Sequence, residues 1–183
     1  MSAYHVMAAH FPIAIWMTTF LFIVLRSFSL PGRGDKLQYA ISLLLFIGVL
    51  AGLATYSLGW MVWSWEALTY SPLARNHILM ASWSLAYWTL LWVLHWRLGE
   101  HLWHGMQRWT MLMLSMVGIS LLSVTGTLGG SLTGNPSGLP DILASLGWDT
   151  NSTFYLPPVM IGVTIASGGV ILAMAWLGQR SKA

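Results

Sequence analysis

The stretch from Val6 to Phe28 reads VMAAHFPIAIWMTTFLFIVLRSF, and it contains no charged side chain before Arg26. About 20 consecutive apolar residues are enough for a helix to cross the hydrocarbon core of a bilayer. Four further stretches of similar character follow along the chain, at residues 39–63, 77–96, 109–128 and 159–177. The sequence therefore predicts an all-α integral membrane protein. Residues 1–183 would form a single transmembrane domain of five helices, the first spanning 6–28.

The overall composition supports the same conclusion. Only 7% of the residues are charged, 56% are hydrophobic, and the mean hydropathy is +0.67. Soluble domains carry about 25% charged residues, so water could not solvate the surface of this chain. The first apolar stretch has no basic residues before it and no Ala-x-Ala site after it, and it is longer than the apolar core of a signal peptide. We expect it to remain in the mature protein.

The basic residues predict the orientation. Arg75 alone would lie on one side of a five-span protein, and the other seven basic residues would lie on the opposite side (Arg26, Arg33, Lys36, Arg97, Arg108, Arg180 and Lys182). The positive-inside rule makes that opposite side cytoplasmic. We therefore expect the amino terminus outside, the carboxyl terminus in the cytoplasm, and a multi-pass location in a bacterial inner membrane. The pI near 9.5 reflects this asymmetry. Nucleic acid is not an expected partner, because no basic cluster with interleaved aromatic residues is present.

The chain contains no cysteine. This excludes disulfide bonds, iron–sulfur clusters ligated by this chain, and covalent attachment of a c-type haem. Any redox centre held by this chain would depend on histidine or methionine ligands.

Two histidines, His10 and His77, carry the main functional hypothesis. Both would lie in the outer half of the membrane, near the starts of helices that run in the same direction. Ionisable residues within membrane spans are costly and usually functional. Two imidazoles on facing helices are the axial ligands that a b-type haem requires, so we predict that these two bind one non-covalent haem iron. The alternative is a pair of interfacial histidines that hydrogen-bond to water or loop carbonyls.

Four nearby residues extend the predicted cofactor site. Arg75 could pair with haem propionates by charge-assisted hydrogen bonds, or it could be a plain interfacial anchor. Gly126, Gly129 and Gly130 mark the outer end of the fourth span, where glycine lets a flat macrocycle or another backbone approach closely. The alternative for these glycines is a helix end followed by a loop. Pro12 removes one backbone donor from the first helix.

The remaining histidines are weaker candidates. His5 projects from a different face of the first helix than His10 does, and it is a reserve ligand. His95 lies 18 residues after His77, on the same helix face and about 27 Å further along the axis. A second haem near His95 would need a partner, and the nearby histidines are predicted to lie in a loop (His101 and His104). We therefore expect one haem.

The segment Ala9-His10-Phe11-Pro12-Ile13-Ala14 resembles the first-helix signature of a family of small bacterial membrane proteins of unknown function. The glycine-rich run from Gly126 to Gly130 and the histidine at His77 are also similar to that family. The resemblance covers about residues 5–135, and it implies a four-helix core with a haem or redox role. The chain departs from the family after Gly130, where the expected tyrosine and histidine are missing and a fifth span is predicted.

A long outer loop, residues 129–158, connects the fourth and fifth predicted spans, with a short helix predicted at 141–148. Loops of this length are usually functional or dock on a neighbour. No heptad run or internal repeat is evident. We interpret the chain as a cytochrome-b-like electron-transfer subunit of a respiratory or photosynthetic complex, non-catalytic by itself. It would link a periplasmic redox subunit to quinone or to another membrane subunit. The alternative is a cofactor-free accessory subunit of a larger membrane complex.

Overall fold

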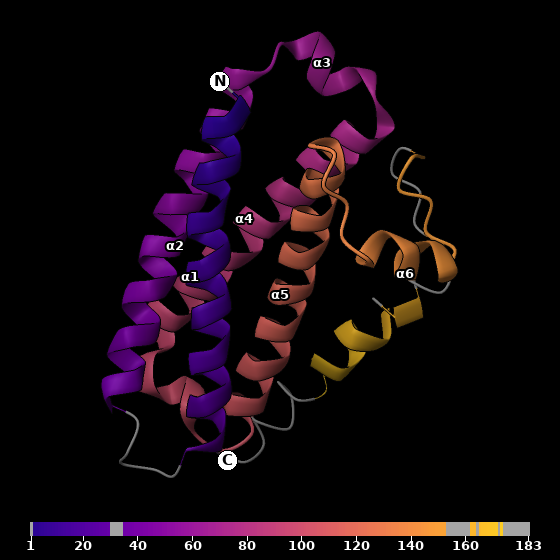
Figure 1. The fold of residues 1–183 in the computed structure, drawn as a ribbon. Coiled ribbons are helices and arrows are strands. Elements are labelled where there is room, and N and C mark those ends of the chain that lie inside the picture. The colour runs from indigo at the N-terminus through magenta and orange to yellow at the C-terminus, as the bar shows by residue number, and fades with distance from the viewer. Residues whose placement is uncertain (1, 30–34, 153–161, 164, 172, 174–183) are drawn as a thin grey trace.

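The computed structural model describes residues 2–29, 35–152, 162–163, 165–171 and 173. All the secondary-structure elements of its described part are helices, four of them long (Figure 1). These are α1 (Ser2–Phe28), α2 (Asp35–Val62), α4 (Pro72–Leu98) and α5 (Gln107–Leu132). Three short elements complete it: α3 (Trp65–Tyr70), the 3₁₀ helix η1 (Gly99–Trp103) and α6 (Leu139–Ser145).

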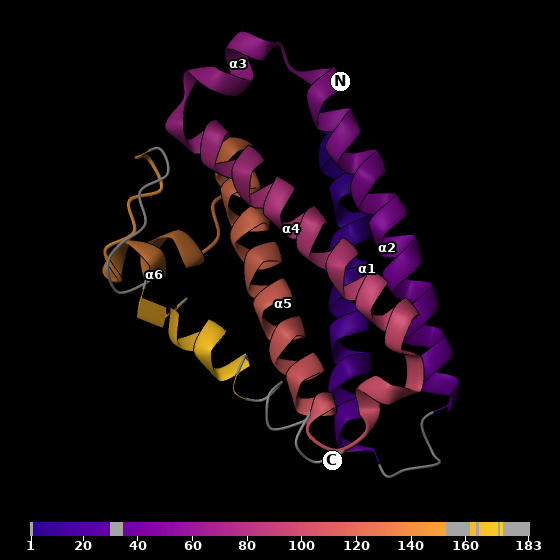
Figure 2. The ribbon, with the colours of Figure 1, turned by 180° about the vertical axis from the view of Figure 1, so that it is seen from behind.

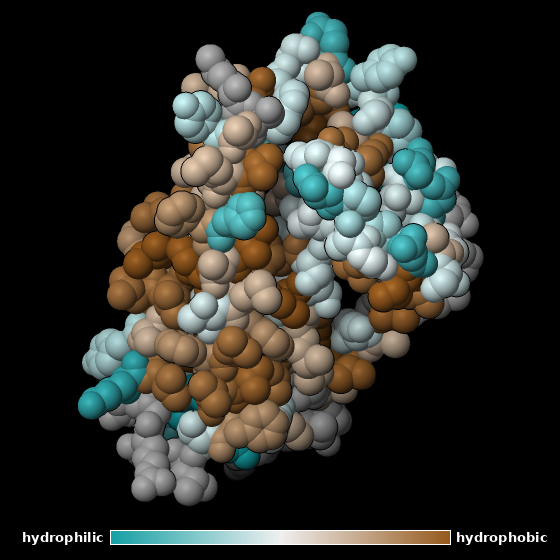
Figure 3. Space-filling model, in the orientation of Figure 1, coloured by the Kyte–Doolittle hydropathy of each residue, from teal (hydrophilic) through white to brown (hydrophobic). Residues whose placement is uncertain are grey.

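Each of the four long helices is long and apolar enough to cross a membrane. The space-filling view shows hydrophobic residues over the sides of these helices and more polar residues over the loop after α5 (Figure 3). The predicted number of spans was five, whereas the described residues contain four candidates. Nine of the 19 residues of the predicted fifth span, 159–177, lie outside the described residues, and its described positions (162–163, 165–171 and 173) are helical. The protein is thus an all-α, multi-pass membrane protein by its four apolar helices.

The helices begin earlier or end later than the hydropathy alone predicts. Ser71 caps α4 by accepting a hydrogen bond from the backbone N–H of Ala74, and Pro72 occupies the first helical position. His77 therefore lies in the second turn of α4 and not at its first residue. The predicted short helix in the outer loop is present as α6, whereas α3 and η1 were not predicted.

The long helices form a ring in which each packs against two neighbours (Figures 1 and 2). Helix α1 packs on α2 and α5, and α4 packs on α5 and α2. Helices α1 and α4 are therefore diagonal to each other, as are α2 and α5. This arrangement has approximate two-fold symmetry along the bundle, with the α1–α2 hairpin related to the α4–α5 hairpin.

The sequence carries the same symmetry, which corrects our conclusion that the chain has no internal repeat. Residues 5–16 (HVMAAHFPIAIW) align with residues 77–88 (HILMASWSLAYW), with four identical positions. Residues 44–59 of α2 align with residues 114–129 of α5 through a shared pattern of Leu, Gly, Thr, Leu and Gly. The repeat is weak in sequence because eight of the twelve aligned positions in the first pair of segments differ.

The repeated residues meet in the core of the bundle. Trp16 of α1 and Trp88 of α4 stack with ring centroids 5.3 Å apart and an interplanar angle of 6°. Each ring lies against a glycine of its own hairpin, Gly48 for Trp16 and Gly118 for Trp88. These glycines occupy equivalent positions, and a side chain at Gly48 would collide with the indole. The two tryptophans thus form the centre of the bundle.

Candidate functional site

A cavity of about 560 Å³ lies at the end of the bundle where α1 and α4 begin. This volume is within the range of small-molecule and cofactor sites. Residues of all four long helices and of α3 line it, and the lining is mainly apolar and aromatic. Three histidines are among the lining residues: His5, His10 and His77. His5 and His10 are on α1, and His77 is on α4.

The His77 imidazole is fixed by two features of α5. Its Nδ1 donates a hydrogen bond to the carbonyl oxygen of Thr125 at 3.1 Å. Its Cε1 lies close to Gly129, because a Cβ placed at this glycine would be 3.0 Å away. A larger residue at position 129 would therefore push the ring from α5 by a few tenths of an ångström. A neutral imidazole with Nδ1 protonated leaves its Nε2 lone pair for a ligand.

The His5 imidazole is fixed in the same way by α2. Its Nδ1 donates to the carbonyl oxygen of Thr55 at 3.1 Å, and its Cε1 would be 3.0 Å from a Cβ at Gly59. These residues are the repeat equivalents of those that hold His77. His5 also packs edge-on against Trp63, with centroids 5.3 Å apart. Both His5 and His77 line the cavity.

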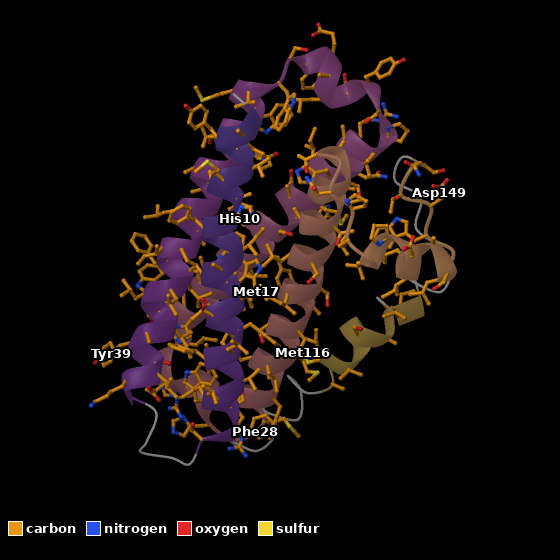
Figure 4. All side chains as sticks on the ribbon, in the orientation of Figure 1. His10, Met17, Phe28, Tyr39, Met116 and Asp149 are labelled. Atoms are coloured by element: carbon orange, nitrogen blue, oxygen red, sulfur yellow. The ribbon has the colours of Figure 1, made fainter. Side chains whose placement is uncertain are left out.

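His10 has a different environment. Its Nδ1 donates to the carbonyl oxygen of Val6 in its own helix at 2.8 Å, and its side chain is exposed (Figure 4). It lines the cavity, and its described hydrogen bond stays within its own helix. Its repeat equivalent is Ser82, which is not a ligand type. His5 and His77 therefore form a matched pair with equivalent contacts, whereas His10 is a single exposed ring.

Thr55 explains how α1 tolerates Pro12 within the His-Phe-Pro-Ile-Ala motif. Proline has no backbone N–H, so the carbonyl of Ala8 loses its usual helical donor. The Thr55 hydroxyl donates to that carbonyl at 3.1 Å, and α1 continues through the proline without a break. Thr55 thus satisfies Ala8 with its side chain and holds His5 with its main chain. Membrane helices accept proline when a neighbouring hydroxyl re-satisfies the freed group.

The other predicted site residues take separate positions. Arg75 does not line the cavity, and its guanidinium donates to the carbonyl oxygens of Thr69 and Tyr70 at the end of α3. Gly130 accepts a hydrogen bond from the backbone of Asn135, and a side chain there would be 2.8 Å from the Asn135 carbonyl oxygen. Gly126 lines the cavity and faces open space.

The opposite end of the bundle is filled by side chains. Trp103 of η1 is buried there, and its indole N–H donates to Gln38. Arg26 forms an ion pair with Glu100 at 2.7 Å and lies over the Trp103 ring. His95 is 1% exposed, and its Nδ1 is 2.9 Å from the Ser42 hydroxyl.

The repeat also bears on the prediction that no second haem lies near His95. The residue of α1 that is equivalent to His95 is Ile23. At this end the repeat therefore pairs a histidine with an isoleucine, whereas at the cavity end it pairs His5 with His77.

From the sequence alone, His5 was ranked as a reserve ligand behind His10, and its equivalence to His77 was not recognised. The signal that could have found it is the repeat, because His5 aligns with His77 and Gly59 aligns with Gly129. Within the described part of the chain, no group of three or more metal-ligating side chains is found. A site on these residues would thus rest on the two imidazoles.

No family model, curated protein or solved structure matches this chain. The similarity to the His-Phe-Pro-Ile-Ala family stays a resemblance. What the fold defines is a helical protein with four candidate membrane spans.

Proposed function

We propose that this protein binds one non-covalent haem b in the cavity and acts as a membrane electron-transfer subunit. The observation that carries the proposal is the matched pair of imidazoles on the diagonal helices α1 and α4. Both have Nδ1 committed to a carbonyl oxygen of a neighbouring helix, at 3.1 Å in each case. In histidines that ligate metals, a hydrogen bond from the other ring nitrogen to a carbonyl oxygen fixes the tautomer and the orientation of the ring. The approximate two-fold axis would then pass close to the iron.

His5 and His77 are the ligand pair that the contacts favour. The sequence pointed to His10 with His77, because both lie within apolar spans. His10, however, is exposed, and its ring is bonded only to its own helix. His5 has the glycine contact and the carbonyl partner that His77 also has. Gly129 and Gly59 would bring the two rings close to their helices and leave room for the macrocycle between them.

The role that follows is electron transfer without substrate turnover at the iron. With His5 and His77 as its ligands, the iron would offer no open coordination site to oxygen or another substrate. When bound, haem supplies a one-electron couple, and this chain contributes the ligands, their orientation and burial. The protonated Nδ1 atoms hold the rings in place, and the aromatic lining excludes water.

We further propose that the cavity end faces the periplasm of a bacterial inner membrane. Of the described basic residues, Arg26, Lys36, Arg97 and Arg108 lie at the opposite end, and Arg75 lies at the cavity end. The positive-inside rule then makes the opposite end cytoplasmic. The loop after α5 would be the docking region for a larger periplasmic or membrane redox subunit. Arg75 would act on the propionates at longer range, since its described bonds are to the α3 carbonyls.

An absorption spectrum of the purified protein tests the proposal. We expect sharp reduced-minus-oxidised α and Soret bands of low-spin haem b and a pyridine haemochrome assay giving one haem per chain. Expression with excess haem precursor guards against incomplete loading. A protein that is folded and haem-free under these conditions would contradict the proposal and favour the cofactor-free accessory subunit.

A further inference from the structure

Two seams of the bundle are equivalent in the repeat, but only one of them is closed. Between α2 and α4, the Tyr56 hydroxyl and the Ser82 hydroxyl hydrogen-bond at 2.8 Å. The equivalent positions between α5 and α1 are Gly126 and His10. A side chain at Gly126 would meet nothing within 4 Å. The α1–α5 seam is therefore open at the height where the α2–α4 seam is closed.

A groove of about 240 Å³ lies along the open seam. Apolar side chains of α1 and α5 form much of it, including Ile13, Met17 and Ile119. Neutral polar side chains of α5 and the following loop also line it (Ser123, Thr127, Asn135 and Ser137). The groove and the cavity share several lining residues, so the two spaces adjoin (Ile13, Leu122, Gly126, Gly130 and Asn135). None of the described residues that line the groove carries a charge.

His10 does not line the groove itself, but it lines the adjoining cavity together with Gly126. It is on the side of α1 that faces the viewer in Figure 4, and the corresponding face in Figure 3 is mainly hydrophobic. An ionisable side chain on such a face of a membrane span is a functional-site candidate. Its Nδ1 donates to the Val6 carbonyl, so the neutral ring presents the lone pair of Nε2. This ring can accept a hydrogen bond and then a proton.

We propose that the open seam binds the headgroup of a lipid-soluble quinol, with His10 Nε2 accepting a hydrogen bond from a quinol hydroxyl. The inference rests on the proposed haem function and names its membrane electron carrier. A quinol fits because the groove is uncharged, opens between two lipid-facing helices and adjoins the haem cavity. The neutral hydroxyl and amide groups suit its second oxygen.

The chemistry balances with the haem as the electron acceptor. A quinol that becomes a quinone releases two electrons and two protons. Haem held by His5 and His77 would supply a one-electron acceptor, and the redox partner would take up the two electrons in turn. His10 takes the first proton at Nε2, and solvent at the outer surface receives both protons in the end.

The test introduces the two residues that close the α2–α4 seam at the equivalent positions of the open α1–α5 seam. The double variant His10→Ser with Gly126→Tyr places the Tyr–Ser pair of the α2–α4 seam between α5 and α1. We would measure haem reduction by decylubiquinol and by menadiol in stopped flow, with dithionite reduction as the measure of loaded haem. We expect a fall of about tenfold or more in the quinol-driven rate, the size of a lost hydrogen bond with added steric exclusion. Ser120→Tyr, which adds the same bulk to an exposed position of α5, should keep the wild-type rate.

An unchanged quinol-driven rate in a haem-loaded double variant would overturn the proposal. Loss of haem loading with no change in the quinol-driven rate per haem would also overturn it, because the seam would then be an entrance for haem. Gly126→Leu fills the seam without touching His10, and it must also slow the quinol reaction if the double variant does not fold. If wild-type protein binds no haem, the proposed function fails. Quenching of tryptophan fluorescence by decylubiquinone then tests the seam alone. Saturable quenching that the double variant lacks supports the site, and its absence in wild type contradicts it.

Discussion

The α1–α2 and α4–α5 hairpins are two versions of one unit, and their differences are as informative as their matches. They agree where a buried ring meets a glycine: His5 with Gly59 and His77 with Gly129. They disagree along the lipid-facing seams, where Tyr56 in one hairpin is replaced by Gly126 in the other. Matched positions would serve the shared cofactor on the axis, and unmatched positions would serve a function that only one side needs.

The largest expected effect comes from breaking the matched histidines. His5→Ala and His77→Ala should each abolish haem retention or leave a high-spin, five-coordinate iron, because each removes one axial ligand. Reduced-minus-oxidised spectra and electron paramagnetic resonance of the purified variants measure this. His104→Ala is the control, since His104 is exposed and bonded to the Glu100 carbonyl at the opposite end.

The same series separates His5 from His10 as the second ligand. His10→Ala should keep a low-spin haem. If His10→Ala loses the haem and His5→Ala keeps it, the ligand pair expected from the sequence is correct and the pair favoured by the contacts is wrong.

The tryptophans at the centre test whether the two hairpins contribute equally to stability. Trp88→Ala and Trp16→Ala should each lower the free energy of unfolding by ~3–5 kcal/mol, as for other buried aromatic residues. Trp88→Phe should cost about 1 kcal/mol more than Trp16→Phe, because the Trp88 indole N–H donates to the Gly118 carbonyl and the Trp16 N–H has no partner. Reversible unfolding in mixed micelles measures both pairs. Equal costs for the two Phe variants would show that this hydrogen bond adds nothing.

The glycines beside the histidines offer a smaller and more local change. Gly129→Ala and Gly59→Ala should push the imidazole by a few tenths of an ångström, since each new Cβ would lie 3.0 Å from a ring carbon. We expect a partial high-spin signal and weaker haem retention on gel filtration. Ser120→Ala is the control on the same helix, because Ser120 is exposed and lines neither the cavity nor the groove. An effect of Ser120→Ala as large as that of Gly129→Ala would argue against the glycine contact as the cause.

Hydropathy predicted the four long helices well, because a 20-residue apolar run has few alternatives in a membrane. It could not fix their ends, which depend on caps such as Ser71. Gly129 was identified as a close-approach glycine, but the residue that approaches it could not be named before α4 and α5 were placed together. The equivalence of His5 and His77 could not be seen while the depth of His5 was estimated from the hydropathy boundary, whereas α1 begins at Ser2. The repeat was missed because only four of the twelve aligned positions in α1 and α4 are identical.

The smallest expected effect concerns the loop that follows the second hairpin and has no counterpart after the first. Asn76, the neighbour of His77, donates to the carbonyl oxygens of Thr150 and Ser152. Asp149 supports this turn, and the hydrogen bond from the Ser152 hydroxyl, followed by that from the Asn151 N–H, lowers its pKa below the ordinary value of 3.8. A lowered pKa means that the folded turn favours the carboxylate, so its contribution is present above about pH 4 and is lost as the pH falls through the lowered pKa. Amide exchange at Asn151 should therefore show protection at neutral pH that declines in acid, after correction for intrinsic exchange rates. Asp149→Asn should reduce the protection and remove its acid dependence, while the haem spectrum stays unchanged. Protection that persists unchanged in this variant would mean that Asn76 alone holds the loop against α4.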